Sequence, residues 1–456
     1  MRLSAALGAR QIVQGEPPRE IRGISTDSRE VCPGDLFVAL PGAYSHGECY
    51  LQQALDRGAT ALLHTVPQNG LRGSFYFFYV PDVVKALLAA AAHRRLLQDG
   101  EVIAVTGSAG KTTVKEAVGA VLGDVPQSKG NFNSEIGMPL SVLSLPRAPY
   151  WVLELGISHV GEMERMAAAL RPTLGVLTNV GSAHIGELGS FDTIFCEKAE
   201  LARQLAPGGR FLAPAHFAKT RFALPSDRAF SVGVGKNADL RLEGIRIDAD
   251  GSSCDLRGLG RVISGLSWPV PGDTGLSVIG LSAGVGVLCG REEKEIREGL
   301  LRAAKKAPRM KRLEVCGRVL LDDSYNASPE ATVAALEVLR HLAQGRATLA
   351  VLGDILELGK YSEVLHRAVG RAVMENGICR LITYGECARL IAAEALALGM
   401  PQAAVKSYAV GEEQDLINEI CRQKESWSAV LFKASHKMAM WHIAREVGER
   451  LCKESI

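Results

Sequence analysis

The stretch Val105-Thr106-Gly107-Ser108-Ala109-Gly110-Lys111-Thr112-Thr113 decides the fold of this chain. The apolar run Val102–Val105 leads into it, and a helix-compatible run, Val114–Val118, follows it. A strand, a glycine-rich loop and a helix form a phosphate cradle, because loop N–H groups and the helix N-terminus face the anion. In such a cradle Lys111 reaches the outer phosphates and the hydroxyl of Thr112 binds Mg²⁺. The stretch therefore predicts a site for a nucleoside triphosphate.

The spacing of this loop departs from the common form of the motif. In that form, G-x-x-x-x-G-K-[ST], a glycine would stand at Val105, so the match here is to a shorter Gly-x-x-Gly-Lys-Thr. Short glycine motifs arise by chance in a chain with 48 glycines. The alternative is a tight strand-to-helix turn that carries a lysine, and the flanking strand and helix favour the phosphate site over it.

Composition indicates a multidomain globular protein. A chain of 456 residues predicts two to four domains, and 47% hydrophobic with 22% charged residues is a normal globular mixture. The net charge of +2 gives no reason to expect nucleic acid or an anionic membrane as a partner. The longest apolar runs, such as Leu87–Ala92, are too short to span a bilayer, and Met1–Ser4 does not begin a signal peptide, so we expect no membrane insertion. Ten scattered cysteines without a C-x-x-C pair suit reduced thiols in a cytoplasmic enzyme.

The pattern of strands and helices predicts an α/β protein of three domains. Residues 1–82 alternate short strands with polar turns, which indicates a small α/β domain. Residues 83–307 form the central domain, where near-continuous apolar runs at Tyr150–Leu155 and Leu174–Val180 suit strands of a parallel sheet buried on both faces. Residues 230–270 favour an antiparallel sheet appended to this core.

Residues 308–456 predict a second domain with the same alternation. Buried strands are expected at Val319–Leu321, Leu349–Leu352 and Ala429–Phe432, with helices at Ala331–His341 and Glu363–Asn376 between them. This order indicates a Rossmann-like α/β fold.

Polar residues follow several predicted strands, where open α/β sheets build their sites. Glu154 ends one apolar run and is a plausible Mg²⁺ ligand or, equally, a capping acid. His184 follows the next run and could contact a metal or a phosphate, although a lone loop histidine is more often a surface residue. Lys198 lies within Glu197–Glu200, a spacing that by itself favours a solvated charge set. Asp323 follows another strand and could hold a ribose or open a helix.

Four sequence motifs, read together, resemble the Mur ligase family, whose members form amide bonds at the expense of ATP in peptidoglycan precursor synthesis. The resemblance covers nearly the whole chain, and the motifs lie at Ser25–Arg29, Gly130–Gly137, Asp322–Pro329 and Gly353–Gly359. The last two are the most specific, and they are similar to the branch that adds D-alanyl-D-alanine to UDP-MurNAc-tripeptide. The Asp-Asn-Pro-Arg signature of the diaminopimelate-adding branch does not occur.

The resemblance implies a division of labour among the three domains. The first would hold the UDP part of the substrate, the central one the ATP phosphates, and the third the incoming amine. The γ-phosphoryl group of ATP would pass to a substrate carboxylate, and the amine would attack the resulting acyl phosphate. ATP and Mg²⁺ are the cofactors implied, UDP-MurNAc-tripeptide and D-alanyl-D-alanine are the small-molecule partners, and a cytoplasmic monomer is expected.

The same resemblance assigns roles residue by residue. Lys111, Lys198 and His184 are the expected catalytic residues, and Lys198 aligns with a lysine that is carbamylated in several family members. The metal ligands expected are Thr112, Glu154 and His184. The residues expected to bind ATP are Gly107, Ser108, Ala109, Gly110, Lys111, Thr112, Thr113, Arg309 and Asp323. Those expected to bind substrate are Ser28 and Arg29 on the uridine nucleotide, Asn133 and Glu135 further along it, Asn326, and Asp354 and Glu357 around the amine.

Three departures from the family pattern keep alternatives open. The run Pro271–Ala283 lacks the asparagine that meets adenine in relatives, Ala307–Arg309 replaces Pro-Gly-Arg, and Lys433–His436 replaces Lys-Gly-Ser-Arg. Histidine in place of arginine loses a permanent charge and a bidentate fork. One alternative is a family ligase with another amine substrate. The other is a degenerate relative that binds without catalysis, against which the retained Gly110-Lys111-Thr112 argues.

Overall fold

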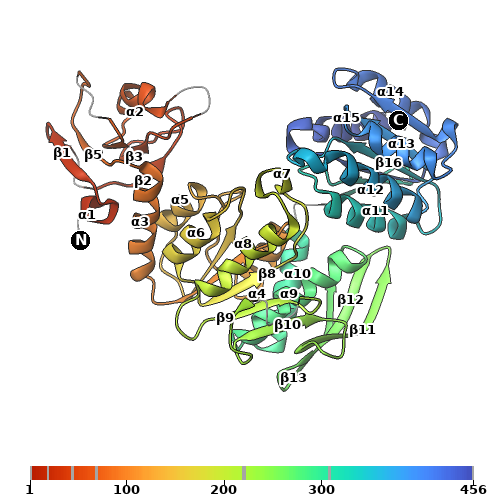
Figure 1. Ribbon diagram of the computed structural model, residues 1–456, viewed down its shortest axis with the longest axis horizontal. Coiled ribbons are helices and arrows are strands. Elements are labelled where there is room, and N and C mark those ends of the chain that lie inside the picture. The colour runs from red at the N-terminus through yellow and green to blue at the C-terminus, as the bar shows by residue number, and fades with distance from the viewer. Residues whose placement is uncertain are drawn as a thin grey trace.

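The computed structural model describes residues 3–17, 20–42, 46–66, 70–217, 222–306 and 310–453. Three β-sheets follow one another along the chain, each covered by its own helices (Figure 1). This confirms the predicted three-part α/β architecture. Within the described residues, no helix combines the length and the apolar character needed to span a bilayer.

The first sheet has the strand order β1-β5-β4-β3-β2, with β1 antiparallel to β5 and the other pairs parallel. Its strands are β1 (Arg10–Gln14), β2 (Gly23–Ser25), β3 (Asp35–Val38), β4 (Ala61–His64) and β5 (Phe75–Tyr79). Its helices are α1 (Leu3–Leu7), α2 (Leu51–Asp56), α3 (Val83–Leu96) and the 3₁₀ turn η1 (Gly47–Tyr50). β3 and β4 are buried along their whole length, as expected for central strands covered on both faces.

Helix α3 belongs to two cores at once. The Asp82 side chain caps its N-terminus by accepting the Lys85 N–H, which fixes the start of the helix at Val83. Val83 and Leu87 pack into the core of the first sheet, while Leu88 on the other side joins the central core. In Figure 1 the helix stands between the first sheet and helices α5 and α6. The predicted boundary at residue 82 therefore assigns to the central domain a helix that completes the first one.

The central sheet has the order β13-β12-β11-β10-β9-β8-β6-β7. Its strands are β6 (Glu101–Thr106), β7 (Tyr150–Leu155), β8 (Leu174–Leu177), β9 (Arg210–Pro214), β10 (Ala229–Gly233), β11 (Leu240–Asp248), β12 (Gly251–Gly258) and β13 (Arg261–Trp268). The helices are α4 (Lys111–Val121), α5 (Gly137–Ser144), α6 (Glu162–Leu170), α7 (Ile185–Leu188), α8 (Phe191–Arg203), α9 (Asp273–Leu288) and α10 (Glu293–Lys306).

This central sheet is mixed, which corrects the prediction of a parallel sheet with a separate antiparallel one. Strands β6 to β11 run parallel to their neighbours, and β12 and β13 continue the same sheet antiparallel. The join is possible because β11 pairs with β10 only at Leu240 and Arg241 and with β12 over most of its length. The antiparallel strands carry polar residues on one side, which is why their sequence looked like a separate unit.

The third sheet has the order β14-β15-β19-β16-β17-β18, with β14 antiparallel and the rest parallel. Its strands are β14 (Lys311–Val315), β15 (Arg318–Asp322), β16 (Thr348–Gly353), β17 (Arg380–Tyr384), β18 (Val405–Tyr408) and β19 (Ala429–Lys433). Its helices are α11 (Pro329–Ala343), α12 (Ser362–Glu375), α13 (Arg389–Ala397), α14 (Glu413–Arg422) and α15 (Met440–Lys453), with 3₁₀ turns η3 (Gly359–Tyr361), η4 (Gln402–Ala404), η5 (Lys424–Ser426) and η6 (His436–Met438). The three predicted strands and the predicted helix Ala331–His341 lie within these elements, and the predicted helix Glu363–Asn376 overlaps α12 but ends one residue beyond it.

Candidate functional site

The phosphate loop joins β6 to α4, as the sequence predicts. Gly110 precedes α4 with φ +75°, a left-handed conformation that favours glycine. At Gly107 a Cβ atom would come within 1.9 Å of the Thr178 hydroxyl, so only glycine fits there. The loop thus passes over the end of β8 with no room for a side chain at its first glycine.

Asn179 holds the loop in place from the end of β8. Its Oδ1 accepts the backbone N–H of Ser108 at 3.0 Å and that of Ala109 at 2.8 Å. The Thr178 hydroxyl donates to the Ala109 carbonyl at 2.6 Å. These two N–H groups are therefore used to hold the loop, and the N–H groups at the start of α4 are the ones left to face a phosphate. Lys111 Nζ donates back to the carbonyl of Gly107 at 3.0 Å.

Thr112 and Glu154 lie together, as expected for a metal site. The Thr112 hydroxyl donates to Glu154 Oε2 at 2.7 Å, and Asn133 Nδ2 donates to Glu154 Oε1 at 2.7 Å. Glu154 is 3% exposed, so its carboxylate is fixed by these two partners at the end of β7. Among the described residues, no group of three or more His, Cys, Asp or Glu side chains is placed so that it could hold a metal ion. Two oxygen ligands still fit Mg²⁺, which commonly takes one or two protein ligands and completes its shell with phosphate and water.

Lys198 lies beneath the loop rather than in solvent, so the reading of its segment as a solvated charge set is wrong. Its side chain is 2% exposed, and its ammonium donates to the Gly107 carbonyl at 3.2 Å. Burial lowers the pKa of Lys198 well below its ordinary value, and the positive charge of Lys111 lowers it further. The Ser190 side chain caps α8 by accepting the Thr193 N–H, and this helix brings Lys198 to the loop.

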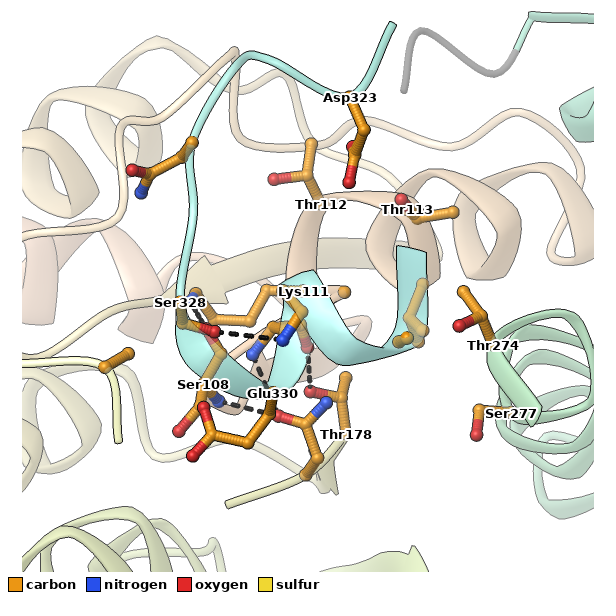
Figure 2. A pocket seen from close by; sticks show the side chains of 18 of the residues that line it. Ser108, Lys111, Thr112, Thr113, Thr178, Thr274, Ser277, Asp323, Ser328 and Glu330 are labelled. Carbon is orange, nitrogen blue, oxygen red and sulfur yellow. Dashed lines mark hydrogen bonds between the residues drawn. The ribbon is translucent and has the colours of Figure 1, made fainter. Parts of the chain in front are cut away.

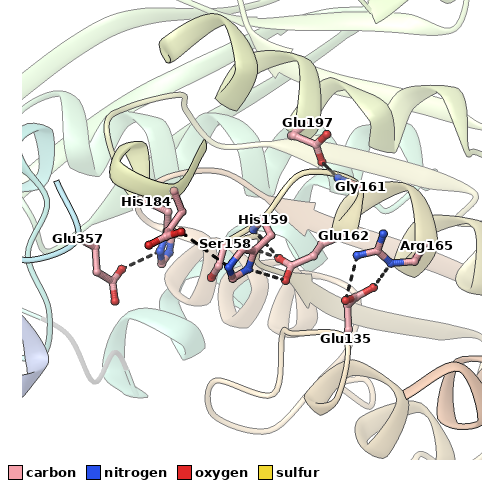
Figure 3. A network of polar contacts seen from close by, with 10 residues as sticks. Glu135, Ser158, His159, Gly161, Glu162, Arg165, His184, Glu197 and Glu357 are labelled. Atoms are coloured by element: carbon pink, nitrogen blue, oxygen red, sulfur yellow. Dashed lines mark hydrogen bonds and ion pairs between the residues drawn. The ribbon is translucent and has the colours of Figure 1, made fainter. Parts of the chain in front are cut away.

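His184 faces the third domain. Its Nδ1 lies 2.7 Å from Glu357 Oε2, so two residues with different predicted roles form one pair (Figure 3). Burial lowers the pKa of His184 despite Glu357, and the charges of Lys111 and Lys198 act in the same direction as burial. The backbone carbonyl of Glu357 also accepts a hydrogen bond from the Gly186 N–H, at 3.0 Å. A third contact, from the Tyr361 hydroxyl to the Gly189 carbonyl, measures 2.7 Å.

Glu330 brings the third domain to the phosphate loop. The carboxylate of this residue, in the first turn of α11, accepts the Ser182 N–H at 2.8 Å and the Ser182 hydroxyl at 3.0 Å. The neighbouring Gly181 N–H in turn donates to Ser108 Oγ at 2.8 Å. Figure 2 shows Glu330 and Ser328 beside Ser108 and Lys111. No local pattern predicts this role, because an acid after Ser328-Pro329 is typical of an ordinary helix start.

A cavity of about 590 Å³ lies between the central and third domains and takes in most of these groups. The central domain contributes the phosphate loop, Glu154 and His184, together with Thr274 and Ser277 of α9 (Figure 2). The third domain contributes Asp323, Asn326, Glu330, Lys433 and His436. Lys433 is 3% exposed and pairs with Asp323, and it also donates to the Asn326 carbonyl at 3.0 Å.

The remaining predicted residues lie elsewhere with partners of their own. Ser28 donates to Gln53 Oε1 at 2.7 Å. The Arg29 guanidinium donates to both carboxylate oxygens of Asp27, and this holds the pKa of Asp27 at about 2. Glu135 pairs with Arg165 (Figure 3). Asp354 accepts the Ala388 N–H at 2.7 Å, so its buried carboxylate orders the turn before α13. Arg309 lies outside the described residues.

Comparison with known proteins gives a consistent family assignment. Family models match at residues 105–279 (Mur ligase middle domain), 308–436 (Mur ligase, glutamate ligase domain) and 20–85 (Mur ligase family, catalytic domain). The UDP-N-acetylmuramoyl-tripeptide–D-alanyl-D-alanine ligase of Synechocystis is 31% identical, covering 94% of this chain and 92% of that protein. The Bacillus subtilis enzyme of the same name is 29% identical and covers 94% and 93%. A crystal structure of MurF from Acinetobacter baumannii superposes with a TM-score of 0.87 at 27% identity, covering 98% of both chains.

Proposed function

The chain belongs to the Mur ligase family, and from this we propose that it is the ATP-dependent ligase that joins D-alanyl-D-alanine to UDP-MurNAc-tripeptide. The relatives that align over almost the whole chain carry that activity in their names. The observation that carries the proposal is the shared cavity, where a phosphate loop and a carboxylate–threonine pair face side chains of the third domain.

The first step activates a carboxylate, which is a poor electrophile until it carries a leaving group. Lys111 and the loop N–H groups would hold the transferred phosphoryl group and offset its charge. Thr112 and Glu154 would hold Mg²⁺, which supplies charge neutralisation at the phosphates. Arg309 and Asp323 are proposed to contact ATP, the latter at its ribose. Holding these groups in a fixed geometry would account for most of the rate enhancement, because phosphoryl transfer depends on positioning.

The second step needs the amine and the acyl phosphate in one dry space. Contacts between the central and third domains close one side of that space, through Glu330 on Ser182 and Glu357 on His184. Exclusion of water protects the acyl phosphate from hydrolysis. The amine then attacks to give a tetrahedral intermediate, which collapses to the amide and phosphate.

Several expectations extend the proposal. The substrate contacts proposed for Ser28, Arg29, Asn133, Glu135 and Asn326 would act along the path from the first domain to the cavity. Carbamylation of Lys198 is proposed because a buried neutral amine reacts with carbon dioxide, and the product would carry a negative charge and two oxygens. One chain supplies both sides of the cavity, which supports a monomer, and the use of ATP supports action in the cytoplasm.

The test is phosphate release from the purified full chain with ATP, Mg²⁺, UDP-MurNAc-tripeptide and a panel of amines. Stimulation by D-alanyl-D-alanine above other amines is expected, with Lys111→Ala as the inactive control. Stimulation by a different amine would reassign the substrate within the family. No turnover with any amine would favour a binding protein without catalysis.

A further inference from the structure

The amine must lose a proton before it attacks, and the structure leaves few groups to take it. The two carboxylates predicted to surround the incoming ammonium are already engaged. Asp354 accepts the Ala388 N–H, and Glu357 pairs with His184. Within the cavity, Asp323 is paired with the buried ammonium of Lys433. Among the other side chains that line this cavity, His436 offers a ring nitrogen that can take the proton.

His436 lines the cavity and is held in a defined orientation. Its Nδ1 lies 3.0 Å from the Tyr325 carbonyl oxygen, and its backbone N–H donates to Asn326 Oδ1 at 3.3 Å. Its ring stacks on Trp441 with centroids 4.8 Å apart and contacts the Tyr325 ring at 5.2 Å. Two aromatic contacts and one hydrogen bond thus hold the exposed imidazole ring, and the backbone hydrogen bond holds the segment that carries it.

The hydrogen bond to Tyr325 decides which ring nitrogen can accept a proton. A carbonyl oxygen only accepts, so Nδ1 must carry the hydrogen. In the neutral ring Nε2 is then a bare acceptor, and it has no hydrogen-bond partner among residues 3–17, 20–42, 46–66, 70–217, 222–306 and 310–453. An arginine at this position would offer donors only.

The charged neighbours of His436 allow this role. Lys433 precedes it on the same segment, but Asp323 and the Asn326 carbonyl take up its ammonium. Lys437 follows it and is exposed. The cavity as a whole has basic and acidic groups on the facing central domain, Lys111 and Glu154 among them.

We propose that His436 is a catalytic base that takes a proton from the ammonium group of the incoming dipeptide. The proposal rests on the ligase activity proposed above and names the residue that serves its second step. The ammonium gives one proton to Nε2 and becomes a free amine. The amine lone pair forms the C–N bond at the acyl carbon, the C–O bond to phosphate breaks, and its electron pair leaves with the phosphate. The second nitrogen proton goes to that departing phosphate, and His436 returns its own proton to solvent.

The experiment compares two nucleophiles on the full chain. With ATP and UDP-MurNAc-tripeptide, His436→Ala should slow amide formation with D-alanyl-D-alanine by about 10² to 10⁴-fold, the usual contribution of a general base. Hydroxylamine is neutral near pH 7 and needs no base, so the same variant should form the hydroxamate at close to the wild-type rate. His442→Ala, an exposed histidine on the same segment and outside the cavity, is the matched control and should change neither rate.

Two further variants separate a base from a cation and from a structural group. His436→Arg should be as slow as His436→Ala with the dipeptide, because it cannot accept a proton. If the arginine variant keeps the wild-type rate, His436 acts as a charge and the proposal is overturned. An equal loss of hydroxamate and amide in both His436→Ala and His436→Gln would also overturn it, as would full amide formation in either. If instead the wild-type chain forms no hydroxamate and no amide, the ligase activity itself fails, which is a separate result.

Discussion

Replacing Lys198 by methionine should change how the stability of the protein depends on pH. The lysine is 2% exposed, and within the described part of the chain its amine donates only to the Gly107 carbonyl. Burial is the main cause that lowers its pKa, and the charge of Lys111 adds to it. The folded protein therefore holds this lysine neutral at pH values where the unfolded chain holds it charged.

The sign and size of the effect follow from this difference. In the unfolded chain a lysine has a pKa of about 10.4, so between the lowered folded value and about 10.4 the unfolded state binds one more proton. The free energy of unfolding then rises with pH by about 1.4 kcal/mol per unit in that window. The stability tied to Lys198 is complete above the unfolded pKa and is lost as pH falls toward the folded one. Lys198→Met removes this dependence and leaves the others unchanged.

Urea unfolding of the two proteins, followed by tryptophan fluorescence, measures the difference. Trp151 and Trp268 are buried in the central domain and report on it. The wild-type value minus the Lys198→Met value should rise with pH below the unfolded pKa, by up to about 1.4 kcal/mol per pH unit. Lys294→Met, at a side chain that is 82% exposed, is the control and should give a flat difference. The buffers must be free of carbon dioxide, because a neutral amine reacts with it. A flat line for Lys198→Met would refute the assignment of a neutral buried amine.

Three more predictions concern the metal site, the domain contact and the core. Glu154→Gln should raise the Mg²⁺ concentration for half-maximal phosphate release by about 10-fold or more, since it removes the fixed carboxylate charge; an unchanged Mg²⁺ dependence would contradict the site. Tyr361→Phe removes a 2.7 Å hydrogen bond to Gly189 and should weaken the domain contact by about 0.5–1.5 kcal/mol, seen as a shift toward open forms by energy transfer between labels on the two domains. Gly299→Ala should cost about 1–3 kcal/mol in urea unfolding, because its Cβ would lie 2.5 Å from the Val121 Cα; no loss would mean that α10 can move away from α4.

The sequence predicted those parts of the site that strand ends bring together. Thr112 and Glu154 lie far apart in the chain, yet Thr112 follows β6 after the loop and Glu154 lies near the end of the neighbouring parallel strand β7, so a shared sheet edge places them in contact. Whether Lys198 is buried or exposed could not be predicted, because helical spacing shows which residues share a face of the helix but not what packs against that face. Burial beneath the phosphate loop depends on how α8 packs, which no local pattern records.

The contacts between domains were beyond the reach of local patterns. Glu330 and Ser182 are 148 residues apart, and nothing near either one distinguishes it from an ordinary cap or loop residue. Asp354 illustrates the opposite case. Its motif suggested a ligand, whereas its carboxylate orders the turn before α13, a need that becomes visible only when β16 and that turn lie side by side.

The double membership of α3 also limits how this protein could exchange its first domain with a relative. A graft that ended at residue 82 would leave the first sheet without Val83 and Leu87, and the transplanted sheet would meet a foreign helix. A graft that included α3 would instead present a foreign surface to α5 and α6. Recombination between relatives should therefore succeed only when α3 travels together with compatible residues on both of its neighbours. The first domain must therefore be inherited together with the surface of the central domain on which α3 packs.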